Sequence, residues 1–370
     1  MTLAIFIIAG FFSPFISWNI ILRTYVIGLI AIIYVCKLFP IFFLFLADMT
    51  RVVQTGAHLI LNAKHWKSKF VKRSNGIMVS GWYLGFAFFL LLLYGMTFGV
   101  YDFRVRKEII KLPELPSSFD GIKIVQFSDV HLGSWTCKDK LKEAVEIINS
   151  LHPDIVFFTG DMVNYTSYES FEFASILSKI KPPMGTFVIL GNHDYGDYSV
   201  WPNAEAKRRN MIYLYDIYKF LDWKLLLNEN VILHRGDDSI AVIGVQNWGR
   251  SKRFQRLGSL EPAVKGIKNV PVQLLLSHDP SHWDASVNKD YKNIDITFSG
   301  HTHGFQFGID CCGVLWSPLQ YMYNEWSGLY TSPVPGSHPQ YLYVSRGLGS
   351  IGYPGRIGIL PEITLFILKR

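Results

Sequence analysis

The chain has 370 residues, of which 49% are hydrophobic, and its 36 Lys and Arg outnumber its 29 Asp and Glu to give a formal net charge of +7. Much of the excess positive charge lies between Arg51 and Lys111, beside apolar runs, and no stretch interleaves basic and aromatic residues as a nucleic-acid groove requires. We therefore attribute the charge to membrane topology and lipid headgroups and expect no nucleic-acid partner. The four cysteines form no CxxC motif, and they indicate neither a disulfide framework nor a thiolate metal site.

Three apolar runs, at residues 3–22, 25–47 and 82–100, are each long enough to cross a bilayer as a helix. The first run could instead be a cleaved signal peptide, but no Lys or Arg precedes Arg23 to supply the basic start. The other two could be buried core helices, but their length and lack of a polar face argue against this. We expect residues 1–102 to form a membrane region of about three helices, and so a multi-pass membrane protein.

Residues 103–118 contain prolines and are expected to be a linker, whereas residues 119–370 have the composition of a soluble domain. At about 250 residues this part is long enough to bury a large core. The predicted strands are 122–127, 155–158, 186–190, 239–245, 272–276, 294–298, 341–344 and 363–368, and the predicted helices are 138–151, 171–180 and 204–221. Alternation of strands and helices early, followed by strand richness, predicts an α/β layered domain rather than a barrel.

Polar residues follow five of these strands at the point where each strand ends. The clusters are Asp129 with His131, Gly160-Asp161, Gly191-Asn192-His193-Asp194, Ser277-His278, and the segment Gly300-His301-Thr302-His303-Gly304. Active sites of open α/β sheets form at the carboxyl ends of strands, so all five clusters point to one edge. Each cluster alone has an ordinary interpretation as a turn, a polar loop or a chance pairing. Their order and spacing together favour one shared site.

The residue types in these clusters predict a metal site. Carboxylate, imidazole and amide oxygen suit Mn, Fe or Zn, and no thiolate is offered. Seven ligands are too many for one tetrahedral ion but suit two divalent transition-metal ions that share a bridge, and Asp161 is the natural bridge because a carboxylate has two oxygens. Two ions about 4 Å apart can hold a hydroxide and neutralise a phosphate, which predicts in-line attack on phosphorus.

The motif series resembles the calcineurin-like metallophosphoesterase family over residues 119–370, and the segments 343–349 and 361–364 are similar to its bacterial membrane-linked members. The resemblance implies a four-layer αββα sandwich, here preceded by the membrane region. It also implies a role for each site residue. The first metal would be held by Asp129, His131, His303 and Asp161, the second by Asn192, His278, His301 and the same Asp161, and His193 would be the general acid to the leaving oxygen.

Several residues keep more than one interpretation. Asn164 and Tyr165 stand where protein Ser/Thr phosphatases of the superfamily carry Asp and Arg, which puts a phosphoprotein substrate in doubt. Phe305 replaces the second Gly of the His-Thr-His-Gly-Gly-Gln pattern and either lines the pocket or packs. His193 either protonates the leaving group or hydrogen-bonds a loop. Arg346 either clamps a phosphate or ties the C-terminal strands together.

An aromatic cluster follows the His-Thr-His motif and consists of Trp316, Tyr321, Tyr323, Trp326 and Tyr330. Core and loop packing is the ordinary interpretation. The alternative is a wall that accepts a lipid chain or enters the membrane interface.

The leading interpretation is a membrane-anchored dinuclear-metal phosphoesterase of phosphate mono- or diesters, and lipid-linked phosphates fit because the anchor keeps the site near the bilayer. One alternative is a hydrolase like the UDP-2,3-diacylglucosamine pyrophosphatases of lipid A synthesis, which needs a cytoplasmic site. Another is a non-catalytic membrane sensor or scaffold. Intact Asp161, Asn192 and His193 argue against the latter.

Charge flanking the apolar runs predicts an extracytoplasmic catalytic domain, because cytoplasmic loops carry the excess of Lys and Arg. Six basic residues separate the second and third runs, against five on the side of the domain. The six are Arg51, Lys64, Lys67, Lys69, Lys72 and Arg73, and the five are Arg23, Arg104, Arg106, Lys107 and Lys111.

Cysteine labelling in intact cells tests this orientation. Ser117→Cys and Ser68→Cys would each be placed in a chain that lacks the native cysteines and treated with an impermeant thiol reagent. We expect labelling at position 117 and protection at position 68. The reverse pattern would put the catalytic domain in the cytoplasm.

Overall fold

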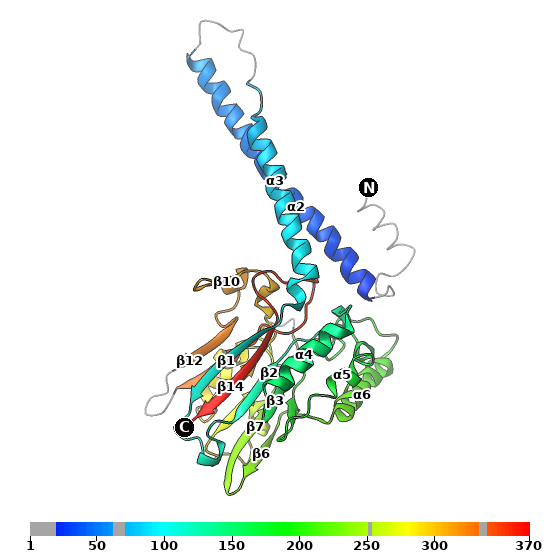
Figure 1. Ribbon diagram of the computed structural model, residues 1–370, viewed down its shortest axis with the longest axis vertical. Coiled ribbons are helices and arrows are strands. Elements are labelled where there is room, and N and C mark those ends of the chain that lie inside the picture. The colour runs from blue at the N-terminus through cyan, green and yellow to red at the C-terminus, as the bar shows by residue number, and fades with distance from the viewer. Residues whose placement is uncertain (1–19, 62–70, 251–253, 333–338) are drawn as a thin grey trace.

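The computed structural model describes residues 20–61, 71–250, 254–332 and 339–370. Over these residues a long helical hairpin stands on a domain built around two β-sheets (Figure 1). The first predicted apolar run, 3–22, lies almost entirely outside the described residues.

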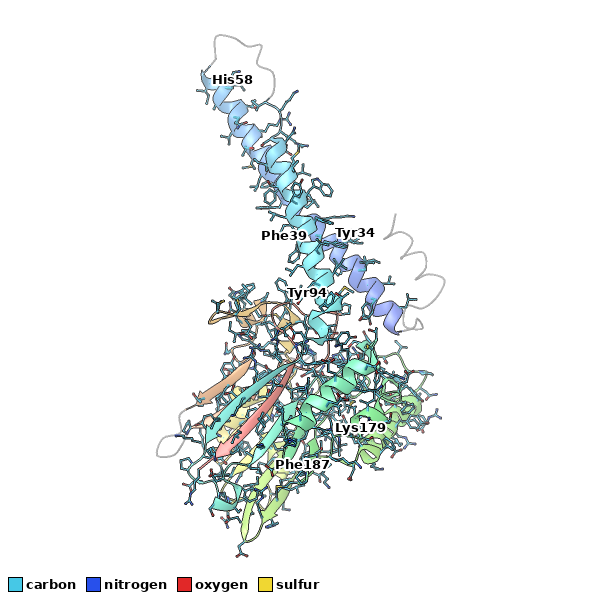
Figure 2. The ribbon with its side chains drawn as sticks, in the orientation of Figure 1. Tyr34, Phe39, His58, Tyr94, Lys179 and Phe187 are labelled. Carbon is cyan, nitrogen blue, oxygen red and sulfur yellow. The ribbon has the colours of Figure 1, made fainter. Side chains whose placement is uncertain are left out.

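The hairpin consists of α2 (Ile20–Leu61) and α3 (Asn75–Thr97), which contain the second and third predicted runs. Both helices are long and apolar enough to cross a membrane, over Thr24–Ile60 and Asn75–Tyr101. The side chains of Tyr34 and Tyr94 project outward from the hairpin (Figure 2). α2 is longer than the predicted run 25–47, because the helix already begins at Ile20 and continues beyond Ala47 as far as Leu61.

Small residues allow the two helices to pack closely, as in many membrane helix pairs. Pro40 lacks an N–H and so leaves the Cys36 carbonyl without its helical partner at that position. Gly85 of α3 faces this carbonyl, and a Cβ atom at Gly85 would lie 2.9 Å from its oxygen. The missing hydrogen bond at Pro40 in α2 therefore lies opposite a glycine in α3, where the two helices approach each other closely.

Two six-stranded sheets form the centre of the domain. The first has the order β1 (Arg104–Lys111), β14 (Glu362–Lys369), β2 (Lys123–Phe127), β3 (Ile155–Phe158), β4 (Thr186–Val188) and β5 (Trp223–Leu225). The second has the order β12 (Gly328–Ser332), β13 (Gln340–Val344), β9 (Ile296–Ser299), β8 (Gln273–Leu276), β7 (Asp238–Gly244) and β6 (Glu229–Arg235). A separate hairpin pairs β10 (Ile309–Cys311) with β11 (Val314–Trp316).

Helices cover the outer face of each sheet. α4 (Lys138–Ser150), α5 (Ala174–Leu177) and α6 (Ala204–Leu221) pack on the first sheet, and α7 (Leu260–Ala263) and the π-helical η6 (Trp283–Val287) pack on the second. The remaining short helices are η2 (Gly99–Tyr101), η3 (Ser117–Phe119), η4 (Leu132–Ser134), η5 (Ser167–Ser170), α8 (Asn288–Asp290), η7 (His303–Gln306) and η8 (Pro318–Tyr321).

A third core lies between the sheets, where Phe157 of β3 meets Phe298 of β9 with ring centroids 4.9 Å apart. The central strands are buried on both faces and therefore read as nearly continuous apolar sequence, such as IVFF in β3. These layers confirm the predicted α/β sandwich with helices on both sides.

Part of the predicted linker 103–118 is a strand. Residues 104–111 form β1, which pairs in parallel with β14 at the edge of the first sheet. Most side chains of β1 are exposed and many are charged, so its sequence lacks the apolar pattern of a buried strand. The helix predicted at 171–180 is also shorter, since only the single turn of α5 lies within it.

Gly95 of α3 provides a test of how the hairpin is fixed to the domain. A Cβ atom there would lie 2.5 Å from the Tyr353 hydroxyl and 2.7 Å from Ile357 Cγ1. We expect Gly95→Leu to destabilise the full chain by about 1–3 kcal/mol, the usual cost of overpacking, measured as a lower thermal unfolding midpoint in detergent. Gly56→Leu is the matched control, because a Cβ atom at that α2 position meets nothing within 4 Å. Equal shifts for both variants would contradict the packing described.

Candidate metal centre

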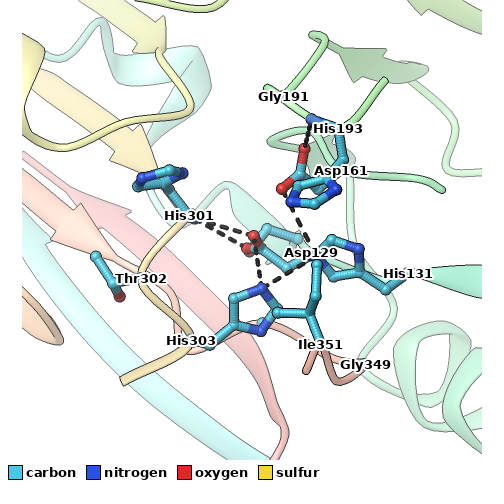
Figure 3. Close-up of polar contacts among 12 residues, drawn as sticks. Asp129, His131, Asp161, Gly191, His193, His301, Thr302, His303, Gly349 and Ile351 are labelled. Carbon is cyan, nitrogen blue, oxygen red and sulfur yellow. Dashed lines mark hydrogen bonds and ion pairs between the residues drawn. The ribbon is translucent and has the colours of Figure 1, made fainter. Parts of the chain in front are cut away.

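The structure brings together the seven candidate ligands and His193 at one edge of the sandwich. Asp129 and His131 follow β2, Asp161 follows β3, Asn192 and His193 follow β4, His278 follows β8, and His301 and His303 follow β9. Both sheets therefore present their carboxyl-terminal strand ends to the same site, as the sequence predicts. Figure 3 shows His131 and His303 facing each other beside Asp129 and Asp161.

Five of these side chains stand on backbone in the left-handed region, which L-residues adopt only at an energetic cost. They are Asp129 (φ 51°), His131 (φ 46°), Asp161 (φ 59°), His301 (φ 71°) and His303 (φ 52°). Backbone of this kind persists where the surrounding contacts hold it, and it gathers at functional sites. The strand ends thus turn sharply to aim these side chains at a common point.

One group of ligand atoms is formed by Asp129, His131 and His303. The Nε2 atoms of His131 and His303 lie 3.0 Å apart, and His303 Nε2 lies 3.4 Å from Asp129 Oδ1. All three side chains are buried, and their ligand atoms lie within 4.8 Å of one another, so they could hold a metal ion.

A second group lies on the other side of Asp161. His278 Nε2 is 3.2 Å from both Asp161 Oδ2 and Asn192 Oδ1, and His301 Nδ1 is 2.8 Å from the same Asn192 oxygen. Asp161 Oδ2 also lies 3.6 Å from His131 Nε2 in the first group. One carboxylate oxygen is thus placed between the two groups.

Hydrogen bonds outside the groups fix which atoms face inward. His278 donates its Nδ1–H to the Thr159 carbonyl over 2.7 Å, which leaves Nε2 for the site. Asn192 donates its amide nitrogen to the Tyr198 hydroxyl over 2.9 Å, which turns its oxygen toward His278.

Asp194 orders the two loops that carry Asp161 and Asn192. Its carboxylate accepts backbone N–H groups of Asp161, Met162 and Gly191, each over 2.9 Å. The sequence showed Asp194 as the last residue of Gly-Asn-His-Asp, but that pattern alone does not distinguish a loop-ordering carboxylate from a ligand.

The electrostatics of the buried cluster favour a cation. Burial raises the pKa of Asp129 and that of Asp194 to about 7, and burial lowers the pKa of His131 to about 3. Burial, the largest single influence, lowers the pKa of His278, but the charge and hydrogen bond of Asp161, the charge of Asp129 and the Thr159 carbonyl together outweigh it and raise this pKa to about 10. The clustered carboxylates thus stabilise the protonated, positively charged form of a buried imidazole. A bound metal cation would be stabilised by the same negative charge.

His193 lies beside the cluster with one ring nitrogen committed. Its Nδ1–H donates to the Asn164 carbonyl over 2.8 Å, and its backbone N–H donates to Asp161 Oδ1 over 2.8 Å. The ring stacks on Tyr198 with centroids 4.2 Å apart. These contacts hold the half-buried ring in place. Because the bond to the Asn164 carbonyl uses Nδ1, it does not occupy the other ring nitrogen, Nε2.

An open pocket of about 340 Å³ leads to the site. Its lining residues are Asp161, Tyr165, Asn192, His193, Tyr198, Phe254, His301, His303 and Ile351. The lining combines polar candidate ligands with aromatic side chains, so the pocket can receive a molecule with a charged end and an apolar or planar part.

The structure describes the surroundings of three residues whose interpretation the sequence left open. Arg346 is buried and donates to Ser327 Oγ over 2.6 Å and to Asp310 Oδ2 over 2.7 Å, which supports a role in tying the C-terminal segments together. Phe305 is 53% exposed and has a φ of 64°. Tyr323, from the aromatic cluster, places its hydroxyl 3.2 Å from His301 Nε2.

Comparisons with known proteins agree with this site. The calcineurin-like phosphoesterase family model matches residues 122–305, from β2 through the His-Thr-His motif. A metallophosphoesterase from Helicobacter pylori strain J99 is 30% identical over 285 residues, which cover 76% of this chain and 69% of that protein. The chain belongs to the calcineurin-like phosphoesterase family. Members of this family use a dinuclear metal centre, and the Asp and His groups described above could hold one.

Two other relatives of this calcineurin-like phosphoesterase carry more specific names. A zebrafish transmembrane protein with a metallophosphoesterase domain is 28% identical over 76% of this chain, which spans 61% of that protein. The UDP-2,3-diacylglucosamine pyrophosphatase LpxG of Chlamydia trachomatis is 29% identical over 66% of this chain and 83% of its own length.

Metal content provides a test of the central position of Asp161 in this calcineurin-like phosphoesterase. We predict that the purified full chain carries close to two transition-metal ions and that Asp161→Asn removes most of both, because one carboxylate oxygen lies between the two groups. Elemental analysis measures the ions directly. Asp290→Asn, at the exposed end of α8, is the control. Full metal content in Asp161→Asn would contradict the shared position.

Proposed function

We propose that the protein is a membrane-anchored, dinuclear-metal hydrolase of phosphate mono- or diesters, with lipid-linked phosphates as the favoured substrate class. The observation that carries this proposal is the position of Asp161 Oδ2, 3.6 Å from His131 Nε2 and 3.2 Å from His278 Nε2. A carboxylate oxygen between two ligand groups suits two ions with a shared bridge.

In this proposal Asp161 would serve both ions. Asp129, His131 and His303 would hold the first ion with it, and Asn192, His278 and His301 would hold the second. Oxygen and nitrogen donors without thiolate suit Mn, Fe or Zn. Two such ions would neutralise phosphate charge and lower the pKa of water.

His193 has the role of general acid in this proposal. Its Nδ1–H is directed to the Asn164 carbonyl, so the opposite nitrogen, Nε2, is the atom that can carry a proton to the leaving oxygen. Tyr198 supports the ring by stacking and also orients Asn192 through a hydrogen bond. One tyrosine therefore positions the proposed acid and one proposed ligand together.

We place α2 and α3 across the membrane. Only 17% of each apolar window is buried within the protein, so most of that surface needs an apolar solvent. The name of the zebrafish relative supports the same placement. The flanking charges favour an extracytoplasmic domain.

A second candidate is hydrolysis of a nucleotide-linked lipid pyrophosphate, as the name of the chlamydial relative suggests. The aromatic lining by Tyr165, Tyr198 and Phe254 favours this candidate, because such rings can stack on a base. It requires a cytoplasmic domain, so the cysteine-labelling experiment separates it from the first candidate. The intact ligand set argues against a non-catalytic sensor or scaffold.

Replacement of His193 tests the proposed acid. We expect His193→Ala to slow hydrolysis of alkyl phosphate esters by about 10²–10⁴-fold, the usual share of general acid catalysis. Activated aryl esters should lose less, because their leaving group departs without a proton, and metal content should stay the same. His234→Ala, on the exposed side of β6, is the control. Equal losses for alkyl and aryl esters would indicate a structural role instead.

A further inference from the structure

Exposed apolar side chains gather on the loops next to the lower end of α3. They are Phe305, Ile309, Val314, Leu315, Tyr321 and Met322, with exposed fractions from 42% to 78%, and we call them the apolar platform. They come from η7, the β10–β11 hairpin and η8 with the residue after it. Figure 1 shows β10 at the end of the domain from which the helical hairpin rises.

The domain is attached to α3 by contacts from the segment between η7 and β10 and from the segment between β13 and β14. Phe307 of the domain packs on Phe88 of α3 with ring centroids 6.1 Å apart, and Ile357 joins a buried cluster with Leu92. The Tyr353 hydroxyl donates to the Leu92 carbonyl. The domain is therefore held against the side of α3 and not only at its last residue.

These contacts lie at a depth that a bilayer would occupy. A hydrocarbon core about 30 Å thick needs about 20 helical residues, which is nearly all of the 23 residues of α3. The opposite end is marked by the ion pair of Arg73 with Asp48, at 2.6 Å, just before α3 begins. Phe88 lies about 13 Å along the helix from Thr97. A domain loop that touches Phe88 thus reaches the level of the lipid chains.

Phe305 adds an independent observation. Its φ of 64° is a conformation that a bulky L-residue adopts at a cost, and its ring is nevertheless 53% exposed. The Phe305 N–H donates to the Thr302 carbonyl over 3.0 Å and so helps to hold this backbone, but exposure of the side chain to water adds no stabilisation. An apolar medium around the ring would add some, because burial of its surface is favourable.

Only short chain segments separate the apolar platform from the pocket. Phe305 lies two residues after His303, and Met322 directly precedes Tyr323, whose hydroxyl is 3.2 Å from His301. On the other side, the pocket residue Ile351 lies two residues before Tyr353, which contacts α3. A ligand that leaves the bilayer at the platform is therefore already beside the pocket.

We propose that the apolar platform lies in the interfacial layer of the bilayer and that the pocket draws its phosphate ester from an amphiphile whose chains remain in the lipid. The first part rests on the proposed membrane insertion of α2 and α3. The second part rests also on the proposed hydrolysis.

Depth-dependent quenching tests the first part on the full chain in phosphatidylcholine vesicles. A fluorophore would be attached at Val314→Cys or Tyr321→Cys in a chain without the native cysteines. Phe86→Cys, exposed on α3, is the deep reference, and Ile232→Cys, on β6 at the far end of the domain, is the reference outside the membrane (Figure 1). Brominated lipids would carry the quencher either near the headgroup or near the chain end.

We expect the shallow quencher to act at positions 314 and 321, the deep quencher to act at position 86, and neither to act at position 232. Quenching at 86 without quenching at 314 and 321 would overturn the inference but leave the membrane anchor intact. Cross-linking between copies at 314 in that case would identify a second chain as the occupant. Absence of quenching at 86 would overturn the membrane anchor and this inference together.

A pair of substrates tests the second part. Bis(p-nitrophenyl) phosphate is soluble, whereas hexadecyl p-nitrophenyl phosphate inserts into phosphatidylcholine vesicles. We expect the combined variant Val314→Ser, Tyr321→Ser, Met322→Ser to lose about tenfold in kcat/KM on the vesicle substrate, mainly through KM, with the soluble substrate unchanged. Ile232→Ser is the matched control.

Equal changes on both substrates would overturn delivery from the bilayer. If the unmodified chain hydrolyses neither substrate, the proposed hydrolysis and this second part fail together, and the quenching result still decides the first part. Metal content and the unfolding midpoint of each variant, both expected to be unchanged, test whether the serine substitutions leave the fold intact.

Discussion

The site depends on the placement of buried carboxylates among imidazoles, with Asp161 at the centre. Its Oδ2 lies between His131 and His278, and its Oδ1 accepts the backbone N–H of His193. Carboxylates this deeply buried are costly without positive charge nearby. The surrounding loops satisfy that requirement in two ways: Asp194 collects backbone N–H groups from both loops, and the ligand groups leave room for cations. We regard this balance as the reason that the strand ends accept left-handed backbone.

The two sheets contribute unequally to this arrangement. The first sheet supplies Asp129, Asp161 and Asn192 from three adjacent strands, and the second supplies imidazoles from β8 and β9. The aromatic contact of Phe157 with Phe298 in the core between the sheets fixes their distance below the site. The ligand geometry is thus set by apolar packing in residues that have no chemistry of their own.

Much of the sandwich and the positions of the site residues could be predicted from the sequence, because buried strands such as IVFF in β3 carry a strong apolar signal and a polar motif follows directly. The assignment of each ligand to a metal came from a family resemblance and stays a prediction. The sequence does not reveal β1 or β6, because both are edge strands with at most one buried side chain, and such strands need not be strongly apolar. The partners of Arg346 could not be predicted, since Asp310 and Ser327 lie far from it in sequence. The exposure of the Phe305 side chain could likewise not be predicted from the sequence, because it depends on how the surrounding loops pack.

β14 lies between β1 and β2, yet residues 362–369 follow every other described strand in the chain. The first sheet therefore has a gap next to β2 until these residues have been synthesised. α2 and α3 are complete long before that, and helices form from local contacts whereas this sheet needs distant ones. In the proposed membrane placement, a nascent chain therefore has its helical anchor formed while its phosphoesterase domain is still open. A domain that is still open can cross a membrane before it folds, so the proposed extracytoplasmic placement is compatible with β14 being the strand that completes the first sheet.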